Sequence, residues 1–331
     1  MAEKLLQFFI PCLTIFVLTV ALSKIIIPIL KSHKVGQRIL DIGPRWHKGK
    51  EGTPTMGGVC FIIPIFLVLA ACAFGFAFQG KSYILEPLAL TVALAIFNGM
   101  IGFFDDYRKL VKKENQGLSF MQKIVLQSLA AIIYIMLMVR TNSLDTSLRI
   151  PFTDDLVELG WVYYIFAFVF IVGMVNSVNL TDGIDGLASS VTLIIGVLFA
   201  VFALTTDDLP LTLISASIIG ATAGFLVYNA YPARVFMGDT GSLFLGGFVT
   251  GAAFMMNEPL IIFFAGFIYV MEALSDIIQV GCYKMTKKRV FKMAPIHHHF
   301  EKCGWSERKI VAVFSLLTVA FCVIAWFSVN L

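Results

Sequence analysis

Four groups of polar residues stand where long apolar segments of this chain end, and their side chains suit chemistry on a charged compound. The groups are Asp105–Asp106, the run from Asn176 to Asp185, Asp239, and the consecutive histidines from His297 to His299. Counting the apolar segments between the groups places all four on one side of a predicted membrane. Carboxylates, amides and histidines that gather at a membrane surface indicate metal-assisted chemistry.

The first group lies at the end of the third apolar segment. Lys109 follows four residues after Asp105, and residues at this spacing share one face of a helix. The carboxylates can bind a hard cation or move a proton, with Lys109 facing a phosphate. The alternative is a solvated helix end with an ordinary ion pair, because charged residues gather where membrane helices meet water.

In the second group, Asn176, Asn179, Asp182 and Asp185 recur at every third residue. This stride places the four side chains on one side of a helix end or tight turn. The intervening glycines allow a ligand to approach the backbone closely. Amides and carboxylates at this spacing suit sugar hydroxyls, a nucleoside or metal-bound water. A capped turn between two spans is the alternative, and it explains one such residue better than four.

Asp239 lies in a Gly-Asp-Thr-Gly-Ser motif before the eighth apolar segment, and Asn229 and Phe236 precede it on the same predicted loop. Asp, Thr and Ser are good helix N-caps, and a helix N-terminus also attracts phosphate. The motif therefore predicts a helix start, an anion site, or both.

The histidines His297, His298 and His299 lie in a long basic loop. Consecutive side chains cannot all face one metal on a regular helix, and zinc ligands are spaced more widely. We therefore expect one or two of them to bind phosphate or move protons, with a plain surface loop as the alternative.

Two further features bear on chemistry. A basic, glycine-rich stretch from Trp46 to Gly58 includes Lys50 and can contact an anionic ligand. The chain has no Walker-type or dinucleotide-binding glycine pattern, which argues against an ATP-driven pump. Glu272 and Asp276 stand inside an apolar segment that they can break, and intramembrane acids usually have a function.

Membrane helices must position these residues, because 58% of the chain is hydrophobic and only 14% is charged. A span needs roughly 20 apolar residues. The fold class predicted is all-α, a polytopic integral membrane protein with one domain over residues 1–331. Ten segments qualify as transmembrane helices: about Leu5–Leu30, Met56–Phe78, Glu86–Phe104, Phe120–Val139, Trp161–Leu180, Leu187–Leu204, Pro210–Asn229, Thr240–Met256, Leu260–Tyr283 and Ile310–Leu331.

Charge predicts the orientation of these helices. The loops that carry the polar groups hold 19 of the 25 Lys and Arg residues, so they face the cytoplasm and both termini lie outside. Lys24 and Lys123 lie near helix ends, where they can reach water. The small-residue spacings Gly220–Gly224 and Gly247–Gly251 predict close helix packing.

Five motifs, in order along nearly the whole chain, together resemble the polyprenyl-phosphate N-acetylhexosamine-1-phosphate transferase superfamily. The Thr-Pro-Thr-Met-Gly-Gly and triple-histidine motifs resemble its phospho-N-acetylmuramoyl-pentapeptide-transferase family in particular. The motifs are His47-x-x-Lys50-x-Gly-Thr-Pro-Thr-Met-Gly-Gly58, Phe104-Asp-Asp-x-x-Lys109, Asn176-x-x-Asn-Leu-Thr-Asp-Gly-x-Asp-Gly186, Gly238-Asp-Thr-Gly-Ser242 and Pro295-x-His-His-His-Phe-Glu301.

The resemblance implies transfer of phospho-MurNAc-pentapeptide from UDP-MurNAc-pentapeptide to undecaprenyl phosphate. The products are undecaprenyl-diphosphoryl-MurNAc-pentapeptide (lipid I) and UMP, in the first membrane step of peptidoglycan synthesis. It also implies Mg²⁺ as cofactor, homodimers, and a place in the bacterial plasma (inner) membrane with the active site facing the cytoplasm. Nucleic acid is not an expected partner. Magnesium suits this chemistry because both substrates are anionic at phosphorus and carboxylates alone would repel them.

The resemblance also implies roles for residues. Asp239 would ligate magnesium with Asp105 or Asp106, and Asp105 is the candidate base for the lipid phosphate. Lys109 and the histidines would orient phosphates. The nucleoside and sugar pocket would contain Phe236, stacked on uracil, together with Asn176, Asn179, Asp182, Asp185 and Asn229. A one-step displacement and a covalent aspartyl-phosphate route both remain open.

Two other functions compete with this interpretation. A sister enzyme would transfer GlcNAc-1-phosphate to the same lipid, and donor preference distinguishes it. A secondary transporter would place its polar groups near the membrane midplane, often within internal repeats. This chain shows no repeat and gathers its polar groups at one surface, which disfavours a transporter.

Overall fold

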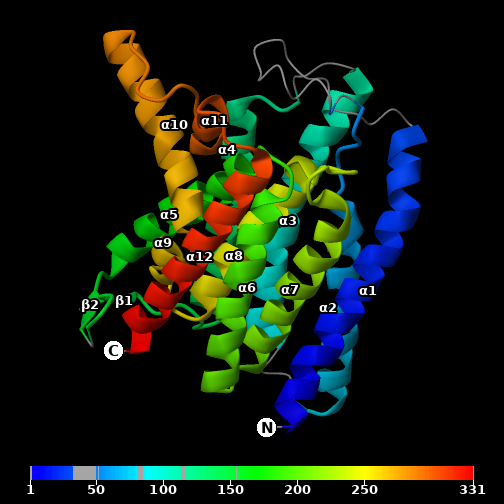
Figure 1. The fold of residues 1–331 in the computed structure, drawn as a ribbon. Helices are drawn as coiled ribbons and strands as arrows, with labels where there is room; N and C mark the ends of the chain where they lie inside the picture. Colours follow the sequence, from blue (N-terminus) through cyan, green and yellow to red (C-terminus); the bar gives the residue numbers. More distant parts are fainter. Residues whose placement is uncertain are drawn as a thin grey trace.

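Long helices account for nearly all of the chain in the structure, a computed structural model that describes residues 2–32, 50, 52–80, 85–112, 117–153 and 155–330. They form an upright bundle (Figure 1). In chain order the elements are α1 (Ala2–Ser32), α2 (Val59–Phe78), α3 (Leu85–Lys112), α4 (Phe120–Arg140), β1 (Ser147–Arg149), β2 (Leu156–Glu158), α5 (Trp161–Thr181), α6 (Leu187–Thr206), α7 (Leu209–Asn229), α8 (Gly238–Met255), α9 (Ile261–Ala265), α10 (Phe267–Thr286), α11 (Ile296–Lys302) and α12 (Glu307–Asn330).

The prediction of an all-α polytopic membrane protein is confirmed. Eight helices within the described residues are long and apolar enough to cross a membrane, namely α1 to α7 and α12. The ninth predicted segment, Leu260–Tyr283, is instead two helices, α9 and α10, which meet at Gly266. The break lies before Glu272 and Asp276. Gly266, a poor helix former, therefore interrupts this segment, and the two acids do not.

Helix α8 lies at the centre of the bundle. Every residue from Thr240 to Phe254 is buried. Close approach of its neighbours requires glycine: a Cβ at Gly247 would lie 2.9 Å from the Leu94 carbonyl oxygen of α3. A Cβ at Gly224 of α7 would lie 2.9 Å from the Phe16 carbonyl oxygen of α1. The predicted packing role of both small-residue spacings is confirmed.

The same close packing sets the end of α3 against the start of α8. A Cβ at Gly102 would overlap the carbonyl oxygen of Asp239. No side chain therefore fits at Gly102 without separating the two helices. The carboxylates that follow Gly102 on α3 are thereby brought to the first turn of α8.

The glycine-rich segment that enters α2 packs against the loop before α8. The Phe236 N–H donates to the Pro54 carbonyl at 2.8 Å, and the Gly57 N–H donates to the Phe236 carbonyl at 2.9 Å. A Cβ at Gly58 would overlap the backbone of Gly241, so this glycine permits the contact. The part of the stretch that follows Lys50 thus supports the loop of Asp239. Residues 46–49, which we expected to contact an anionic ligand, lie outside the described residues.

Two elements were not predicted from the sequence. One is the antiparallel hairpin β1–β2, in which Leu148 pairs with Val157. The other is α11, a short helix that carries the three histidines in place of the expected loop. Both chain termini lie toward one end of the bundle, and α11 lies toward the other (Figure 1).

Candidate active site

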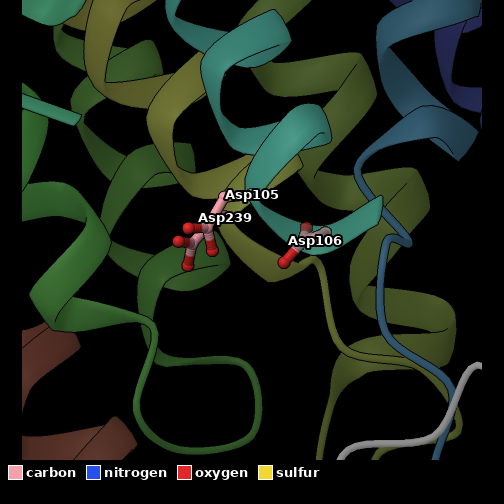
Figure 2. A group of neighbouring side chains, drawn as sticks. All are labelled: Asp105, Asp106 and Asp239. Atoms are coloured by element: carbon pink, nitrogen blue, oxygen red, sulfur yellow. The ribbon is translucent and has the colours of Figure 1, made fainter. Parts of the chain in front are cut away.

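Three carboxylates from two helices meet where α3 passes the start of α8. Asp105 and Asp106 come from α3 and Asp239 from the first turn of α8, and one oxygen of each lies within 4.8 Å of the others. Asp239 lies beside Asp105, with Asp106 to one side (Figure 2). Among the described residues this is the one group of three or more such side chains close enough to hold a metal ion.

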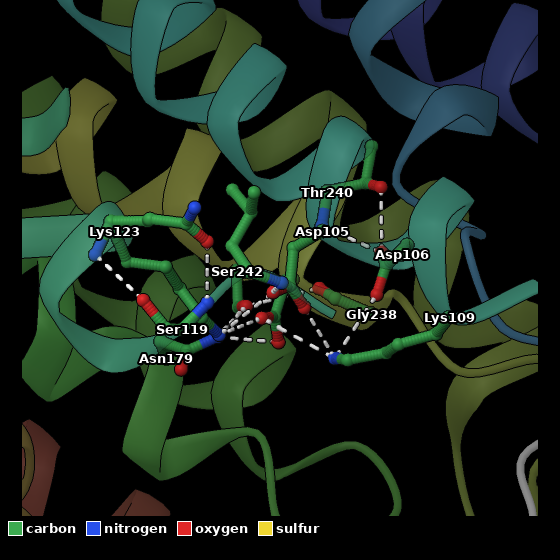
Figure 3. Close-up of polar contacts among 12 residues, drawn as sticks. Asp105, Asp106, Lys109, Ser119, Lys123, Asn179, Gly238, Thr240 and Ser242 are labelled. Atoms are coloured by element: carbon green, nitrogen blue, oxygen red, sulfur yellow. Dashed lines mark hydrogen bonds and ion pairs between the residues drawn. The ribbon is translucent and has the colours of Figure 1, made fainter. Parts of the chain in front are cut away.

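Two lysines neutralise most of this charge (Figure 3). The Lys109 Nζ lies 2.5 Å from Asp105 Oδ2 and 3.5 Å from Asp239 Oδ2. The Lys123 Nζ lies 2.6 Å from Asp239 Oδ2 and 3.4 Å from Asp105 Oδ1. The i,i+4 contact of Lys109 agrees with the sequence prediction. The interpretation of Lys123 as a residue that reaches water was wrong, because the first turn of α4 brings it into the cluster.

Asp239 is held by both lysines and by an amide from α5. Burial acts to raise its pKa, but the ammonium groups of Lys109 and Lys123 outweigh burial and hold the pKa below its usual range. Asn179 Nδ2 donates to Asp239 Oδ1 at 3.1 Å and to Ser242 Oγ at 2.7 Å. Asp239 is therefore held as an anion in a fixed orientation.

Asp105 and Asp106 have different partners, although they are adjacent in sequence. The backbone N–H of Leu118 donates to Asp105 Oδ1 at 2.7 Å. The N–H and hydroxyl of Thr240 donate to Asp106 Oδ2 at 2.9 and 2.7 Å. The predicted helix start at the Gly-Asp-Thr-Gly-Ser motif is confirmed. The Thr240 N–H in its first turn is capped by Asp106 of α3 and not by a side chain of the motif.

The donor set fits a hard divalent cation. Carboxylate oxygens are the ligands that Mg²⁺ prefers, and it usually binds through one or two carboxylates together with substrate phosphates. Three carboxylates face two ammonium groups here, which leaves one negative charge in a buried group. A bound cation would neutralise this remaining negative charge, and the lysines could then pair with phosphate.

The turn that follows α5 brings Asp182 next to this cluster. Burial raises the pKa of Asp182 well above its ordinary value, and repulsion from Asp239, Asp106 and Asp185 raises it further. Within the described part of the chain, burial and charge repulsion act on its carboxyl and no hydrogen bond does. Asp182 is thus a polar group next to the cluster with bonding capacity left for a ligand.

Asn176 does not face the cluster. Its Nδ2 donates to Gln127 Oε1 of α4 and to the Val172 carbonyl, each at 2.8 Å. The three-residue stride drifts around a regular helix, so Asn176 turns toward α4 while Asn179 faces Asp239. The expectation that all four residues of the run share one side was wrong for Asn176.

Lys50 and Asp185 form an ion-pair network with a third residue, Glu307. The Lys50 Nζ lies 2.7 Å from Asp185 Oδ1 and 2.6 Å from Glu307 Oε2. The N–H of Ala233 donates to Asp185 Oδ2 at 2.9 Å. This network joins the segment before α2, the turn after α5, the loop before α8 and the start of α12. The sequence offered no motif that singled out Glu307.

Asn229 holds the loop that leads to α8, and Phe236 lies on that loop. Asn229 is buried, accepts from the Ser189 hydroxyl at 3.0 Å and donates to the Val235 carbonyl at 3.0 Å. Its amide therefore links α6, α7 and the loop that leads to α8. Phe236 is half-buried, and its ring has no aromatic partner within the described residues.

The three histidines of α11 face three different neighbours, as expected for consecutive residues on a helix. His297 is fully buried and its Nδ1 lies 2.9 Å from Glu272 Oε2. His298 Nδ1 lies 2.6 Å from Glu301 Oε2, and the Lys292 N–H donates to His299 Nδ1 at 3.1 Å.

His297 is the histidine that touches the turn after α5. A Cβ at Gly183 would overlap His297 Nε2, so the glycine lets the imidazole lie against this turn. The intramembrane acid Glu272 thereby acquires a partner that the sequence did not reveal. Its acceptor oxygen orients the buried imidazole and leaves Nε2 directed at the turn.

Comparison with known proteins agrees with this geometry. Residues 87–257 match the model of the glycosyl transferase family 4, and residues 50–62 match signature 1 of phospho-N-acetylmuramoyl-pentapeptide-transferase. The matched ranges include the carboxylate cluster and the segment around Lys50.

Relatives with that enzyme name cover almost the whole chain. The one from Acetivibrio thermocellus is 44% identical over 96% of this chain and 93% of its own length. The one from Clostridioides difficile is 44% identical over 95% and 94%, and that from Bacillus thuringiensis is 43% identical over 90% of each. The chain belongs to the phospho-N-acetylmuramoyl-pentapeptide-transferase family and is a phosphosugar transferase of the membrane.

Proposed function

We propose that this protein transfers phospho-MurNAc-pentapeptide from UDP-MurNAc-pentapeptide to undecaprenyl phosphate, giving lipid I and UMP. The observation that carries the proposal is the cluster of Asp105, Asp106 and Asp239 with Lys109 and Lys123 at one end of an apolar bundle. A lipid acceptor accounts for the membrane, and two anionic substrates account for a site that combines carboxylates with lysines.

We assign the metal site to Asp239 with Asp105 or Asp106. Mg²⁺ bound there would neutralise the carboxylates and offset the charge of the diphosphate. Lys109 and Lys123 would hold phosphate oxygens once the metal takes over their carboxylate partners. Their present distances of 2.5 to 3.5 Å from Asp105 and Asp239 keep them within reach of the same ligands.

In the transfer, an oxygen of the lipid phosphate forms a bond to the sugar-bearing phosphorus of the donor. The bond from that phosphorus to the UMP oxygen breaks, and UMP leaves with the bonding electrons. Asp105 is the proposed base that accepts the proton of the lipid phosphate. Its two oxygens already contact Lys109, Lys123 and the Leu118 N–H, which orient the carboxylate.

The donor pocket is proposed to lie around the turn after α5. Asp182 and Asn179 border the carboxylates, and Lys50, Asp185 and Phe236 form its outer part. Asn176 and Asn229 contribute by holding helices together, because their amides are bonded within the fold. Among the histidines, we assign the phosphate-facing role to His297, which lies against the Gly183 turn.

We further propose that residues 1–331 act as a single catalytic domain in the bacterial plasma membrane. The site would face the cytoplasm, where the nucleotide donor is made, and the protein would form homodimers. Both termini at the end opposite α11 support an even number of crossings.

The test measures UMP release by purified protein in detergent. Undecaprenyl phosphate is supplied with either UDP-MurNAc-pentapeptide or UDP-GlcNAc, each with and without Mg²⁺. The proposal expects Mg²⁺-dependent UMP from the muramoyl donor alone. UMP from UDP-GlcNAc alone would assign the sister reaction, and no UMP from either donor by folded protein would refute phosphosugar transfer to this lipid.

A further inference from the structure

The cytoplasm-directed half of α10 leaves the bundle. No residue between Ser275 and Ile296 is buried. Figure 1 shows the upper part of α10 extending past the other helices before the chain turns back to α11. This segment is therefore free to contact the membrane around the protein.

The tip of this segment is strongly cationic. Lys284, Lys287, Lys288, Arg289 and Lys292 fall within nine residues, and all five are exposed. No acidic residue occurs between Asp276 and Glu301. None of the five forms an ion pair in the described part of the chain, in contrast to Lys50, Lys109 and Lys123.

Exposed apolar side chains stand between these cations. Met285 is 78% exposed and Val290 is 53% exposed, and Tyr283, directly before the first of the cations, is 46% exposed. Unpaired cations alternating with exposed apolar side chains are typical of a segment at the headgroup level of a bilayer, where each kind of side chain has a favourable environment.

The tip is an ordered structure. The Gln279 side chain accepts from the N–H groups of Val290 and Phe291 at 3.0 and 2.9 Å and donates to the Phe291 carbonyl at 3.0 Å. Lys287 ends α10 in the left-handed conformation at φ 57°. The reversal is thereby fixed to the helix and holds the cations together. Lys292 Nζ donates to the Lys302 carbonyl at 3.2 Å and Lys287 Nζ lies 5.8 Å from the centre of the Tyr283 ring, but no carboxylate of the described residues pairs with either.

We infer that residues 283–292 form a docking surface for the headgroups of anionic phospholipids in the leaflet that α11 faces. The match of charge and apolarity carries this inference, and it is independent of the transfer reaction. The surface is also connected to α11: the Phe291 ring packs edge-on against His299 at 5.8 Å, and the Lys292 N–H donates to His299 Nδ1.

Native mass spectrometry tests the inference on the full-length protein in detergent, titrated with phosphatidylglycerol and phosphatidylcholine of identical acyl chains. We expect phosphatidylglycerol to bind preferentially. Lys288→Gln with Arg289→Gln removes two charges from the tip and should weaken phosphatidylglycerol binding by roughly 30-fold, because each such cation contributes about 1 kcal/mol near an anionic surface.

The matched control removes two charges from the opposite end, with Lys4→Gln and Arg140→Gln, and should keep the wild-type preference. Both double variants should keep the wild-type melting temperature, since Lys288, Arg289 and Arg140 make no described ion pair and the Lys4–Asp207 pair is exposed. Equal binding of the two lipids by the wild type would overturn the inference and leave the cations as determinants of topology only. An unchanged preference in the tip variant would overturn it as well.

Discussion

Asp239 differs from Asp105, which also contacts both lysines, because it accepts a hydrogen bond from Asn179 as well. It is therefore the point where α3, α4, α5 and α8 meet. Asp105 and Asp106 each accept a hydrogen bond from a backbone N–H with one carboxylate oxygen. These contacts single out Asp239 as the residue whose charge the proposed chemistry can least spare.

Asp239→Asn should therefore lower kcat by on the order of 10³-fold or more, because a metal ligand stabilises several kcal/mol of developing charge. The amide keeps a hydrogen-bond acceptor for Asn179, so the variant should still fold. UMP release and the melting temperature are measured together, with Asp155→Asn at the opposite end as the matched control. Near-normal turnover by folded Asp239→Asn would contradict the assigned role.

Asp182 should make stability depend on pH in a defined direction. Its pKa in the folded protein is raised above the ordinary value of 3.8. Between those two values the folded state binds more protons than the unfolded state, so stability is lost as pH rises through this window. Asp182→Asn removes this loss, and its apparent melting temperature should fall less than that of the wild type as pH rises from about 4.

The melting temperatures of the two proteins are compared over a pH series without Mg²⁺, so that metal binding does not contribute. Asp155→Asn again serves as the control and should follow the wild type. A steeper decline for Asp182→Asn than for the wild type would show that burial does not penalise this carboxylate.

The contact of α3 with α8 is the packing on which the site depends. Gly102→Ala would push a methyl group into the Asp239 carbonyl and separate the helices. We expect a loss of about 1–3 kcal/mol in stability, as for other overpacked contacts, and a loss of activity. Gly75→Ala is the matched control, because a Cβ there meets nothing within 4 Å and alanine favours a helix.

Thermal unfolding and UMP release of the two alanine variants decide this point. Gly75→Ala should melt at or above the wild-type temperature with normal activity. An unchanged melting temperature and activity for Gly102→Ala would mean that α3 and α8 can separate at this level without disturbing Asp239.

Helix α11 depends on the buried pair of Glu272 and His297. Glu272→Ala leaves a buried imidazole without its acceptor, which costs about 1–3 kcal/mol, whereas Glu272→Gln retains an acceptor oxygen. Amide hydrogen exchange over residues 296–302 should accelerate in the alanine variant and stay near wild type in the glutamine variant. Equal exchange in both variants would show that packing alone holds α11.

The two ends of the whole molecule carry different groups of residues. The carboxylate cluster, the histidines and the cationic tip of α10 lie toward one end, and the termini and the β1–β2 hairpin lie toward the other. In the proposed orientation the first of these ends faces the cytoplasm. The positive-inside rule agrees with this placement, because Lys50, Lys109, Lys123 and the cations of the α10 tip all lie at that end.

Thiol labelling tests the orientation. Cys303, beside α11, is the exposed one of the six cysteines. A membrane-impermeant maleimide should label it only after cells are permeabilised, and Cys303→Ser should abolish this labelling. Thr153→Cys, on the exposed hairpin, should be labelled in intact cells. Labelling of Cys303 in intact cells would reverse the orientation.

The sequence by itself determined most of the long helices and identified the polar groups at their ends. Helices such as Trp161–Thr181 and Leu209–Asn229 differ from their predicted bounds by one residue. A helix that crosses a bilayer needs a long apolar run, and such runs can be recognised from the sequence alone. Asp105, Asp106, Lys109 and Asp239 were identified from residue type and position at the ends of such runs.

Only the tertiary structure decided which of these side chains meet. Lys123 and Glu307 belong to no recognised spacing, yet they pair with Asp239 and Lys50, whereas Asn176 turns away from the site. Partner choice depends on how each helix is rotated and how closely it approaches its neighbours, which glycines such as Gly102 and Gly183 set through contacts between distant segments. Local patterns of residue type do not contain that information, because rotation and approach are properties of the packed bundle.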